Sequence, residues 1–481
     1  MTDFVILYEI EPRELESIII LGNELKCRGY SVKYFSIRDF EPYKYFVYRR
    51  TVKRFRNDTR VLLVPSCYHN KEMLDYYYSP FGKVEKIVNL RWEQYFRNYI
   101  MDDPSSGAYI FPNEGAKNAY HVCWGNVSLQ SMIDIGISKK QLLKTGPIQL
   151  DILRKEFRSY YMNKEQLFEK YNLDSRRKTV LFISSYSNAT NKADYFRYLN
   201  TFFSGKYSAD YEAIALEKES YALTVEWIEE FLEKNREINF VWRPHPTELK
   251  TDVLSALENK YPYFKVITDY NVKQWILTCE VIVTWLSTAA IEAFFADKAC
   301  FILRPVEYPY AKDLCLYRNA SYIKTKEEFM NILSVNCENS LDRDYVHQCY
   351  DVRKSEPSYV RLADQLEEIY QSRERFPWDD EVIRRFNRTD RLRYIKRSAL
   401  YIIKAKIANI ILRLSKVVHL SFGEKINQIL MTYDYNYKKM HSRKDSLVTE
   451  IEAALAPKVR RAYKIRTGNQ PKNQNANKVV N

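Results

Sequence analysis

The sequence predicts an α/β protein built from two Rossmann-like halves. Short apolar runs typical of buried strands alternate with amphipathic helical patterns, which favours parallel sheets covered by helices on both faces. The alternation stops after Asp151 and begins again at Thr179. With 481 residues, the chain is long enough for two or three domains with sizeable cores. We therefore expect two domains, with a ligand-binding cleft at the carboxyl ends of their strands.

The first half opens with an apolar strand at 4–9 and an amphipathic helix at 13–29, which Gly29 closes. Further apolar runs predict strands at 30–37, 61–66, 86–90, 108–113 and 119–125. These elements form a predicted N-terminal domain at 1–150, and the charged, helical stretch at 151–178 is expected to be a connector.

The second half repeats the pattern. Apolar runs predict strands at 179–184, 238–244, 265–268, 280–285 and 299–304, and helical spacing predicts helices at 217–235, 287–298 and 355–376. We expect a C-terminal Rossmann-like domain at 179–354. A late helix within 355–380 is expected to return toward the N-terminal domain.

Composition and motifs argue against several classes of protein. No GxGxxG, GxxxxGKS or GxxxxGKT motif occurs, which argues against a dinucleotide enzyme and a P-loop ATPase. No apolar run approaches 18 residues, and the opening residues lack a basic n-region, so neither a transmembrane helix nor a secretory signal is expected. The 8 Cys and 6 His show no metal-ligand spacing, which predicts reduced cytosolic thiols and no metal site.

Positive charge is concentrated at the carboxyl end. The formal net charge is +14, and residues 381–481 alone contain 23 Lys and Arg against 7 Asp and Glu. No acid lies between Asp390 and Glu424, where apolar residues recur at helical spacing from Leu392 to Val417. A basic amphipathic helix of this kind binds anionic lipid surfaces. Its basic residues are Arg391, Arg393, Lys396, Arg397, Lys404, Lys406, Arg413 and Lys416.

We predict that 381–466 attaches the protein to the inner face of the cell membrane, and that 467–481 is a disordered tail. Two other interpretations stay open. The helix can pack its apolar stripe on the protein body and leave its cations in solvent. Its cations can also bind nucleic acid, but no nucleic-acid-binding motif accompanies them, so no nucleic-acid partner is expected.

The run Val241-Trp242-Arg243-Pro244-His245-Pro246 places an Arg and a His directly after a predicted strand. Proline restricts the backbone on both sides of His245, which holds its ring at the carboxyl end of the strand. Arg243 offers a planar fork to a phosphate or carboxylate, and His245 can donate to an anionic oxygen. Alternatively, His245 caps a helix and Arg243 pairs with a surface acid.

A second predicted strand, 280–285, runs straight into a helix through Ser287 and Thr288. Small hydroxyl residues there let an anion reach the free N–H groups of the helix start. Glu292, one turn further, can accept hydrogen bonds from ribose hydroxyls. The alternative is that Ser287 is an ordinary helix N-cap.

Acidic residues form the third group of candidates. Glu114 follows the predicted strand at 108–113, and a glutamate in a closed cleft can act as a general base on a hydroxyl. Alternatively, it is a solvated loop acid. Three further candidates for the general base follow the first strand: Glu9, Glu11 and Glu14. The alternative is that they form an acidic first helical turn.

Together these motifs resemble those of bacterial surface-carbohydrate (capsule and lipopolysaccharide) biosynthesis glycosyltransferases of the GT-B fold. Similar families are polysialyltransferases, capsular Kdo transferases and, more distantly, CDP-glycerol glycerophosphotransferases. The resemblance covers about residues 1–335 and rests on the order of the motifs. These are Glu9…Arg13-Glu14-Leu15 with Gly29, Asn113-Glu114-Gly115, Trp124-Gly125, Gly146-Pro147…Asp151, Arg243-Pro244-His245-Pro246 and Ser287-Thr288.

The resemblance implies an acceptor-binding N-terminal domain and a nucleotide-donor C-terminal domain. Glu114 matches the general base, His245 matches the contact to the nucleotide phosphate, and Ser287-Thr288 match the phosphate-holding helix start. No metal or other cofactor is implied. The first acidic position of the family motif is Asn113 here, so Glu114 must serve as the base. If the Glu114 side chain points away from the cleft, the candidate for the general base becomes Glu9, Glu11 or Glu14.

The resemblance implies inverting, metal-independent transfer of a sugar from a nucleotide donor, CMP-linked and acidic, to a surface polysaccharide or lipid-linked acceptor. One alternative is a CDP-glycerol or CDP-ribitol phosphotransferase that makes a teichoic-like polymer. Another is a non-catalytic scaffold in a polysaccharide assembly complex, to which Asn113 lends weight. We expect a cytoplasmic protein that is peripherally attached to the membrane.

Overall fold

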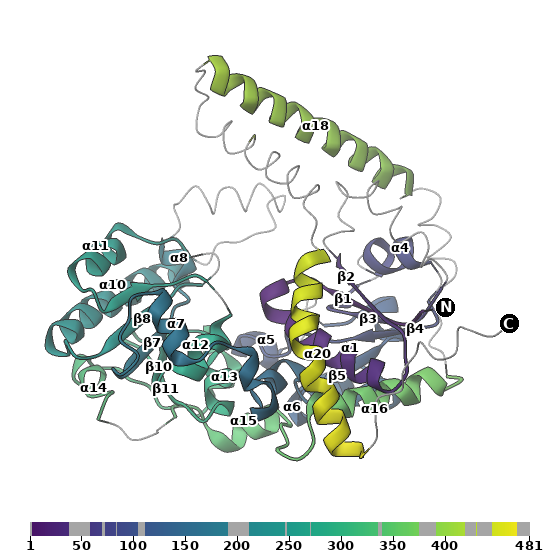
Figure 1. The fold of residues 1–481 in the computed structure, drawn as a ribbon, viewed down its shortest axis with the longest axis horizontal. Helices are drawn as coiled ribbons and strands as arrows, with labels where there is room; N and C mark the ends of the chain where they lie inside the picture. Colours follow the sequence, from purple (N-terminus) through teal and green to yellow (C-terminus); the bar gives the residue numbers. More distant parts are fainter. Residues whose placement is uncertain are drawn as a thin grey trace.

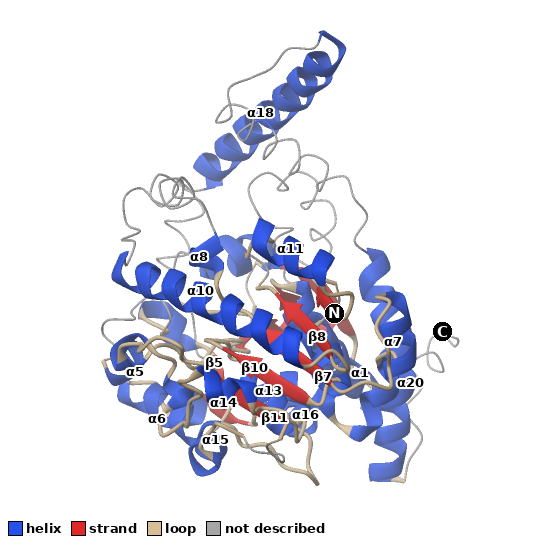
Figure 2. Ribbon diagram, turned by 90° about the vertical axis from the view of Figure 1, so that its left-hand side faces the viewer, coloured by secondary structure: helices blue, strands red, loops and turns tan. Residues whose placement is uncertain are grey.

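A computed structural model describes residues 2–37, 58–69, 73–82, 84–103, 111–190, 211–245, 248–269, 271–334, 339–374, 391–418, 430 and 445–468. Within these residues the chain forms two parallel β-sheets, each covered by helices (Figure 1, Figure 2). The predicted α/β architecture with two Rossmann-like units is confirmed.

The N-terminal sheet has its strands in the order β2-β1-β3-β4-β5-β6, all parallel. Most of its strand residues are buried apolar residues, because helices cover both faces. The strands are β1 Thr2–Tyr8, β2 Val32–Ser36, β3 Thr59–Val64, β4 Lys86–Asn89, β5 Tyr120–Cys123 and β6 Leu142–Lys144.

Two features of this sheet differ from the prediction. β6 was missed, because three residues are too few to show a pattern. The predicted strand at 108–113 falls partly on residues outside the described ones, and its described end, 111–113, is not in a strand. Pro112 has no N–H to donate to a strand ladder, and the Asn113 N–H instead bonds the Tyr68 carbonyl at 2.8 Å.

The C-terminal sheet has the order β11-β10-β7-β8-β9, again parallel throughout. β7 lies in the middle of the sheet, and the chain passes outward to β9 before it returns to β10, which is a doubly wound arrangement. The strands are β7 Thr179–Ile183, β8 Asn239–Arg243, β9 Phe264–Val266, β10 Val281–Thr284 and β11 Ala299–Ile302.

Helices surround each sheet (Figure 2). Those of the N-terminal domain are α1 Glu11–Cys27, η4 Met73–Tyr78, α4 Ser79–Phe81, α5 Asn98–Asp102, η6 Glu114–Asn118, α6 Asn126–Asp134, η7 Lys139–Gln141 and η8 Ile148–Leu153. Those of the C-terminal domain are α8 Ser187–Thr190, α10 Tyr211–Lys234, α11 Asp252–Lys260, α12 Val272–Thr278, α13 Ala290–Phe295, η10 Tyr310–Lys312, η11 Cys315–Tyr317, α14 Lys326–Met330 and α15 Arg343–Cys349.

The connector contains η9 Lys155–Tyr160 and α7 Lys164–Lys170. After the C-terminal domain, the chain crosses back, and α16 Ser358–Gln371 packs on α1 and η8. The buried carboxylate of Asp151 fixes the start of α16, since it accepts the backbone N–H groups of Ser358 (3.2 Å) and Tyr359 (2.7 Å).

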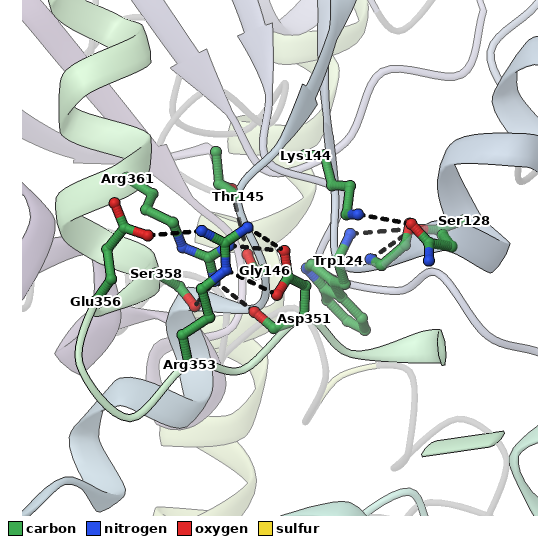
Figure 3. Close-up of polar contacts among 12 residues, drawn as sticks. Trp124, Ser128, Lys144, Thr145, Gly146, Asp351, Arg353, Glu356, Ser358 and Arg361 are labelled. Carbon is green, nitrogen blue, oxygen red and sulfur yellow. Dashed lines mark hydrogen bonds and ion pairs between the residues drawn. The ribbon is translucent and has the colours of Figure 1, made fainter. Parts of the chain in front are cut away.

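Two glycines let the returning chain lie against the N-terminal domain. A Cβ at Gly125 would lie 2.2 Å from the Cys349 carbonyl oxygen, and one at Gly146, whose φ is +81°, would lie 2.4 Å from that of Asp351. Figure 3 shows Asp351 beside Gly146 and facing two guanidinium groups. The returning chain therefore packs against the Trp124-Gly125 and Gly146-Pro147 motifs.

Two long helices follow in the basic region, α18 Arg391–Val418 and α20 Asp445–Thr467. α20 packs on α1 and η9. In both views α18 lies apart from the two sheets and the helices that cover them (Figure 1, Figure 2). None of the described helices is long and apolar enough to cross a membrane.

Candidate active site

Loops that follow strands of both sheets meet at the junction between the domains. After β9, the Asn271 side chain donates to the Pro12 carbonyl (2.9 Å) and to the Glu16 carboxylate (3.1 Å) near the start of α1. After β4, the Asn98 side chain donates to the Tyr310 carbonyl (2.8 Å), which follows β11. Because ligands of α/β folds bind at the carboxyl ends of parallel strands, a ligand can contact both domains here.

His245 lies in the loop after β8, and a buried carboxylate fixes this loop. Glu248 accepts hydrogen bonds from the backbone N–H groups of His245 (3.3 Å) and Tyr186 (3.2 Å) and from the Trp242 indole (3.1 Å). The His245 residue is exposed, and its Nδ1 lies 3.1 Å from Ser187 Oγ. Partial desolvation lowers the pKa of His245 below its usual range, so the free imidazole is neutral at pH 7.

The short helix α8, which follows β7, is held by a second buried carboxylate, Glu217 on α10. Glu217 accepts from the backbone N–H groups of Asn188 (2.6 Å) and Ala189 (3.0 Å). Burial raises the pKa of both Glu217 and Glu248. Neither role was predicted. Glu248 stands beside the His motif in the sequence, whereas a glutamate inside a helix carries no sign of an inward orientation.

Arg243 is the last residue of β8, and its side chain bonds the loop that follows β9. Its Nη1 donates to the carbonyls of Ile267 (3.0 Å) and Asp269 (2.7 Å), which follow β9. This nitrogen is committed to the backbone and anchors the loop. The phosphate contact expected of Arg243 stays a prediction.

Ser287 and Thr288 follow β10, three and four residues after its end. The Ser287 N–H donates to the Tyr317 hydroxyl (3.0 Å), which in turn donates to the Ser287 carbonyl (2.8 Å). The Ser287 hydroxyl accepts the Ala289 N–H (3.2 Å). The N-cap of α13 is Ala289, without a side-chain capping bond, so the alternative that Ser287 is the helix N-cap is wrong. Thr288 is exposed. The helix expected at 287–298 is only the 6 residues of α13, so its dipole is weak.

Glu292 on α13 and Lys273 on α12 lie within electrostatic range of each other. Burial raises the pKa of the half-buried Glu292, and the positive charge of Lys273 opposes this shift. Lys273 is only 3% exposed. Neither side chain makes a hydrogen bond or ion pair with another residue that the structure describes. Lys273 was not predicted, because a lysine near a helix start is usually a surface residue.

The acids after β1 form a network at the start of α1. Glu14 is buried and accepts from the Glu9 N–H (2.7 Å) and the Arg13 guanidinium (2.7 Å), and Arg13 also pairs with Glu93 after β4. Burial raises the pKa of Glu14. Glu11 lies in the first turn of α1 with Glu14, which matches the helix-start alternative. Glu93 was missed, although an acid directly after the strand at 86–90 is a recognisable signal.

Glu114 is the first residue of η6, close to the carboxyl end of β3. Its side chain lies outside the part of the chain that the structure describes. The general-base role, and the meeting of Glu114 with His245, therefore stay predictions.

Among the described residues, no three His, Cys, Asp or Glu side chains come together to hold a metal ion. The expected independence from metal and cofactors stays a prediction.

The apolar stripe of α18 is open to solvent. Seven large apolar residues are between 48% and 70% exposed: Leu392, Leu400, Ile403, Ile407, Ile410, Leu414 and Val418. Four of the predicted membrane cations, Lys396, Lys404, Lys406 and Arg413, are exposed as well. The side chains of Arg391, Arg393, Arg397 and Lys416 are not among the described ones.

No protein-family model matches the chain, and no curated protein matches it in sequence. Solved structures do match. A variant of the wall teichoic acid polymerase TagF has a TM-score of 0.50 and 12% sequence identity, over 77% of this chain and 89% of that chain. UDP-GlcNAc 2-epimerase from Methanocaldococcus jannaschii has a TM-score of 0.48 and 15% identity, over 76% of this chain and 100% of that chain.

Identities this low concern the fold alone. Two parallel-sheet domains joined by a connector, with a final helix that crosses back to the first domain, define the class of proteins with the GT-B fold. This protein has that fold, as its sequence motifs led us to expect.

Proposed function

We propose that the protein is a glycosyltransferase that moves a sugar from a nucleotide donor to a surface polysaccharide or a lipid-linked acceptor. The observation that carries this proposal is the His245 loop. A buried carboxylate fixes an exposed imidazole at the carboxyl end of β8, in the domain whose loops meet the start of α1. A preorganised donor of this kind is suited to charge that develops on a leaving phosphate.

In the proposed reaction, the acceptor hydroxyl oxygen attacks the anomeric carbon and the bond from that carbon to the phosphate oxygen breaks. Glu114 takes the acceptor proton, and the configuration inverts. His245, with the hydroxyls of Ser287 and Thr288, stabilises the departing nucleotide. The donor that the sequence motifs favour is a CMP-activated acidic sugar, and the nucleotide leaves as CMP.

Replacement of His245 tests this proposal. His245→Ala is expected to lose transfer and donor hydrolysis by roughly 10²–10³-fold, the usual effect of removing one preorganised donor. His347→Ala is the matched control, because His347 is also exposed and lies in the same domain. Full activity in His245→Ala, with folding intact in both variants, would refute the assignment.

Product analysis separates the proposal from its alternatives. Released CMP with a new glycosidic bond supports glycosyl transfer, whereas released CMP with a new phosphodiester bond identifies a CDP-glycerol or CDP-ribitol phosphotransferase. A thermal shift with CMP, CDP and UDP addresses the scaffold alternative, which predicts stabilisation by none of them.

We infer that α18 attaches this enzyme to the inner face of the membrane. Its exposed apolar stripe and its cations, without a single acid over Arg391–Val418, suit an anionic leaflet. α16 before it and α20 after it both pack on α1, so the membrane helix is tethered at both ends to the acceptor domain. A lipid-linked acceptor would then approach from the side of that domain.

Vesicle sedimentation tests the attachment. The full chain is expected to bind vesicles of phosphatidylglycerol and phosphatidylcholine, and to bind pure phosphatidylcholine weakly. Ile403→Asp with Ile407→Asp is expected to weaken binding at least 100-fold, because burying each Ile contributes about 1.5–3 kcal/mol. Ile465→Asp is the control, since Ile465 on α20 is also exposed. Equal binding by the α18 variant and the wild type would exclude α18 as the anchor.

A further inference from the structure

Lys273 carries a buried positive charge for which the described residues supply no direct partner. Only 3% of the residue is exposed, and its ammonium makes no hydrogen bond or ion pair with a residue that the structure describes. A charge largely removed from water without a partner is unfavourable. The position therefore calls for an anion from outside the chain.

The place of Lys273 in the fold is at the domain junction. It is the second residue of α12, directly after Asn271, whose side chain caps this helix (3.0 Å to the Lys273 N–H) and also binds the start of α1. On the other side, Gln274 accepts the Met162 N–H of the connector at 2.9 Å. α12 is thus held firmly with its first turn at the carboxyl edge of the sheet, the edge that also carries His245.

Two other described cations at this edge bond protein groups. Arg243 donates from Nη1 to two carbonyls after β9. Arg304, which follows β11, forms a buried ion pair with Asp313 (2.7 Å). The phosphate-binding role expected of Arg243 therefore has a better candidate in Lys273.

Glu292 completes the local arrangement. It lies one helix away, on α13, within electrostatic range of Lys273 but without a direct ion pair. The site thus offers a donor with full positive charge and a carboxylate acceptor that do not bond each other directly. A ribose 5′-phosphate matches this pattern, because its phosphate oxygens accept and its hydroxyls donate.

We propose that Lys273 binds a phosphate oxygen of the nucleotide donor while Glu292 accepts from the ribose hydroxyls. This inference rests on the proposed function and names the cation of its donor site. In the reaction, the Lys273 ammonium faces the oxygen that gains negative charge when the bond to the sugar breaks. Lys273 is then a group that contacts the substrate at the reacting phosphate.

Calorimetric titration with CMP and with cytidine isolates the phosphate contact. For the wild-type protein, CMP is expected to bind more tightly than cytidine. In Lys273→Met, CMP affinity is expected to fall roughly 10- to 100-fold, the usual range for a hydrogen bond to a charged group, while cytidine affinity stays unchanged. Lys273→Arg is expected to recover part of the loss. Lys260→Met, at an exposed lysine of the same domain, is the control and is expected to change neither affinity.

The melting temperature of the ligand-free protein gives a second readout. If the charge of Lys273 is unpaired, Lys273→Met and Lys273→Gln are expected to melt at or above the wild-type temperature. A variant that melts lower, or that loses CMP and cytidine affinity equally, gives Lys273 a structural role and overturns the inference. An unchanged ratio of the two affinities also overturns it, with the proposed function intact. If the wild type binds no nucleotide, both fail together.

Discussion

α18 and α20 come from the same basic region, but they differ in where their large apolar residues lie. Ala405 and Ala408 of α18 are buried, whereas the larger residues of its stripe are exposed. Leu455 and Val459 of α20 are fully buried in the core cluster that contains α1. On α18, residues such as Ile403 and Leu414 remain about half exposed. Amphipathic spacing is therefore common to both helices and does not decide where an apolar face goes.

Charge distinguishes the two helices. α18 contains no acid, whereas α20 contains Asp445, Glu450 and Glu452. One of these acids, Glu452, pairs with Lys26 on α1. α20, which docks on its own protein, thus carries both signs of charge. A helix with cations alone is better suited to an anionic surface outside the protein.

The largest expected effect is a difference in the free energy of unfolding between two Leu→Ala variants, one on each helix. Leu455→Ala is expected to lower the free energy of unfolding by about 2–5 kcal/mol, the range for a fully buried leucine. Leu414→Ala on α18 is expected to change it by less than about 0.5 kcal/mol, because Leu414 is 56% exposed. Urea unfolding measures both, and hydrogen exchange of α20 amides reports local undocking.

The same two variants separate packing from membrane binding. Leu414→Ala is expected to weaken vesicle binding, and Leu455→Ala is not. Equal destabilisation by both substitutions would mean that the stripe of α18 is packed in solution, and the contrast between the helices would be lost.

The second prediction concerns α16, the other helix that docks on α1. Burial raises the pKa of Asp151, which caps α16, to about 7. A raised pKa means that the folded state favours the protonated carboxyl, so its contribution to stability is full below pH 4 and is lost as the pH rises through 7. Between pH 5 and pH 8 this amounts to about 2–3 kcal/mol.

Asp151→Asn is expected to remove this dependence, because the amide is neutral throughout and can still accept one of the two N–H groups. Urea unfolding at pH 5, 6, 7 and 8 should show a smaller fall in stability for the variant than for the wild type. Parallel curves would show that Asp151 stays ionised in the fold, and that its two hydrogen bonds and the nearby Arg361 outweigh burial.

Sequence patterns predicted the elements with strong periodicity and missed what depends on contact between distant segments. The strands at β7, β8 and β10 and the amphipathic helix α18 follow from local apolar spacing. The docking of α20 on α1 joins residues more than 400 positions apart, and no local pattern records such a contact.

The candidate site divides in the same way. The position of His245 after β8 follows from the two prolines and the strand before them. The inward orientation of Glu217 and the burial of Lys273 depend on how helices pack, which a single sequence does not reveal. The anion contact of Arg243 stays a prediction. The hydrogen bonds from its Nη1 to two carbonyls could not be predicted, because only the folded loop brings these groups within reach.

The smallest expected effect concerns the ion pair between α1 and α20. It tests whether this pair or apolar packing holds α20 on α1. Lys26 and Glu452 pair between α1 and α20, with side chains 33% and 28% exposed. Partly exposed pairs usually contribute less than about 1 kcal/mol. A double-mutant cycle of Lys26→Met and Glu452→Gln is expected to give a coupling energy in that range, and the coupling should shrink further in 0.5 M salt. If the coupling energy exceeded the free energy of unfolding lost in Leu455→Ala, the ion pair would be what holds α20 on α1. The acid-free composition of α18 would then by itself explain why its apolar stripe stays exposed.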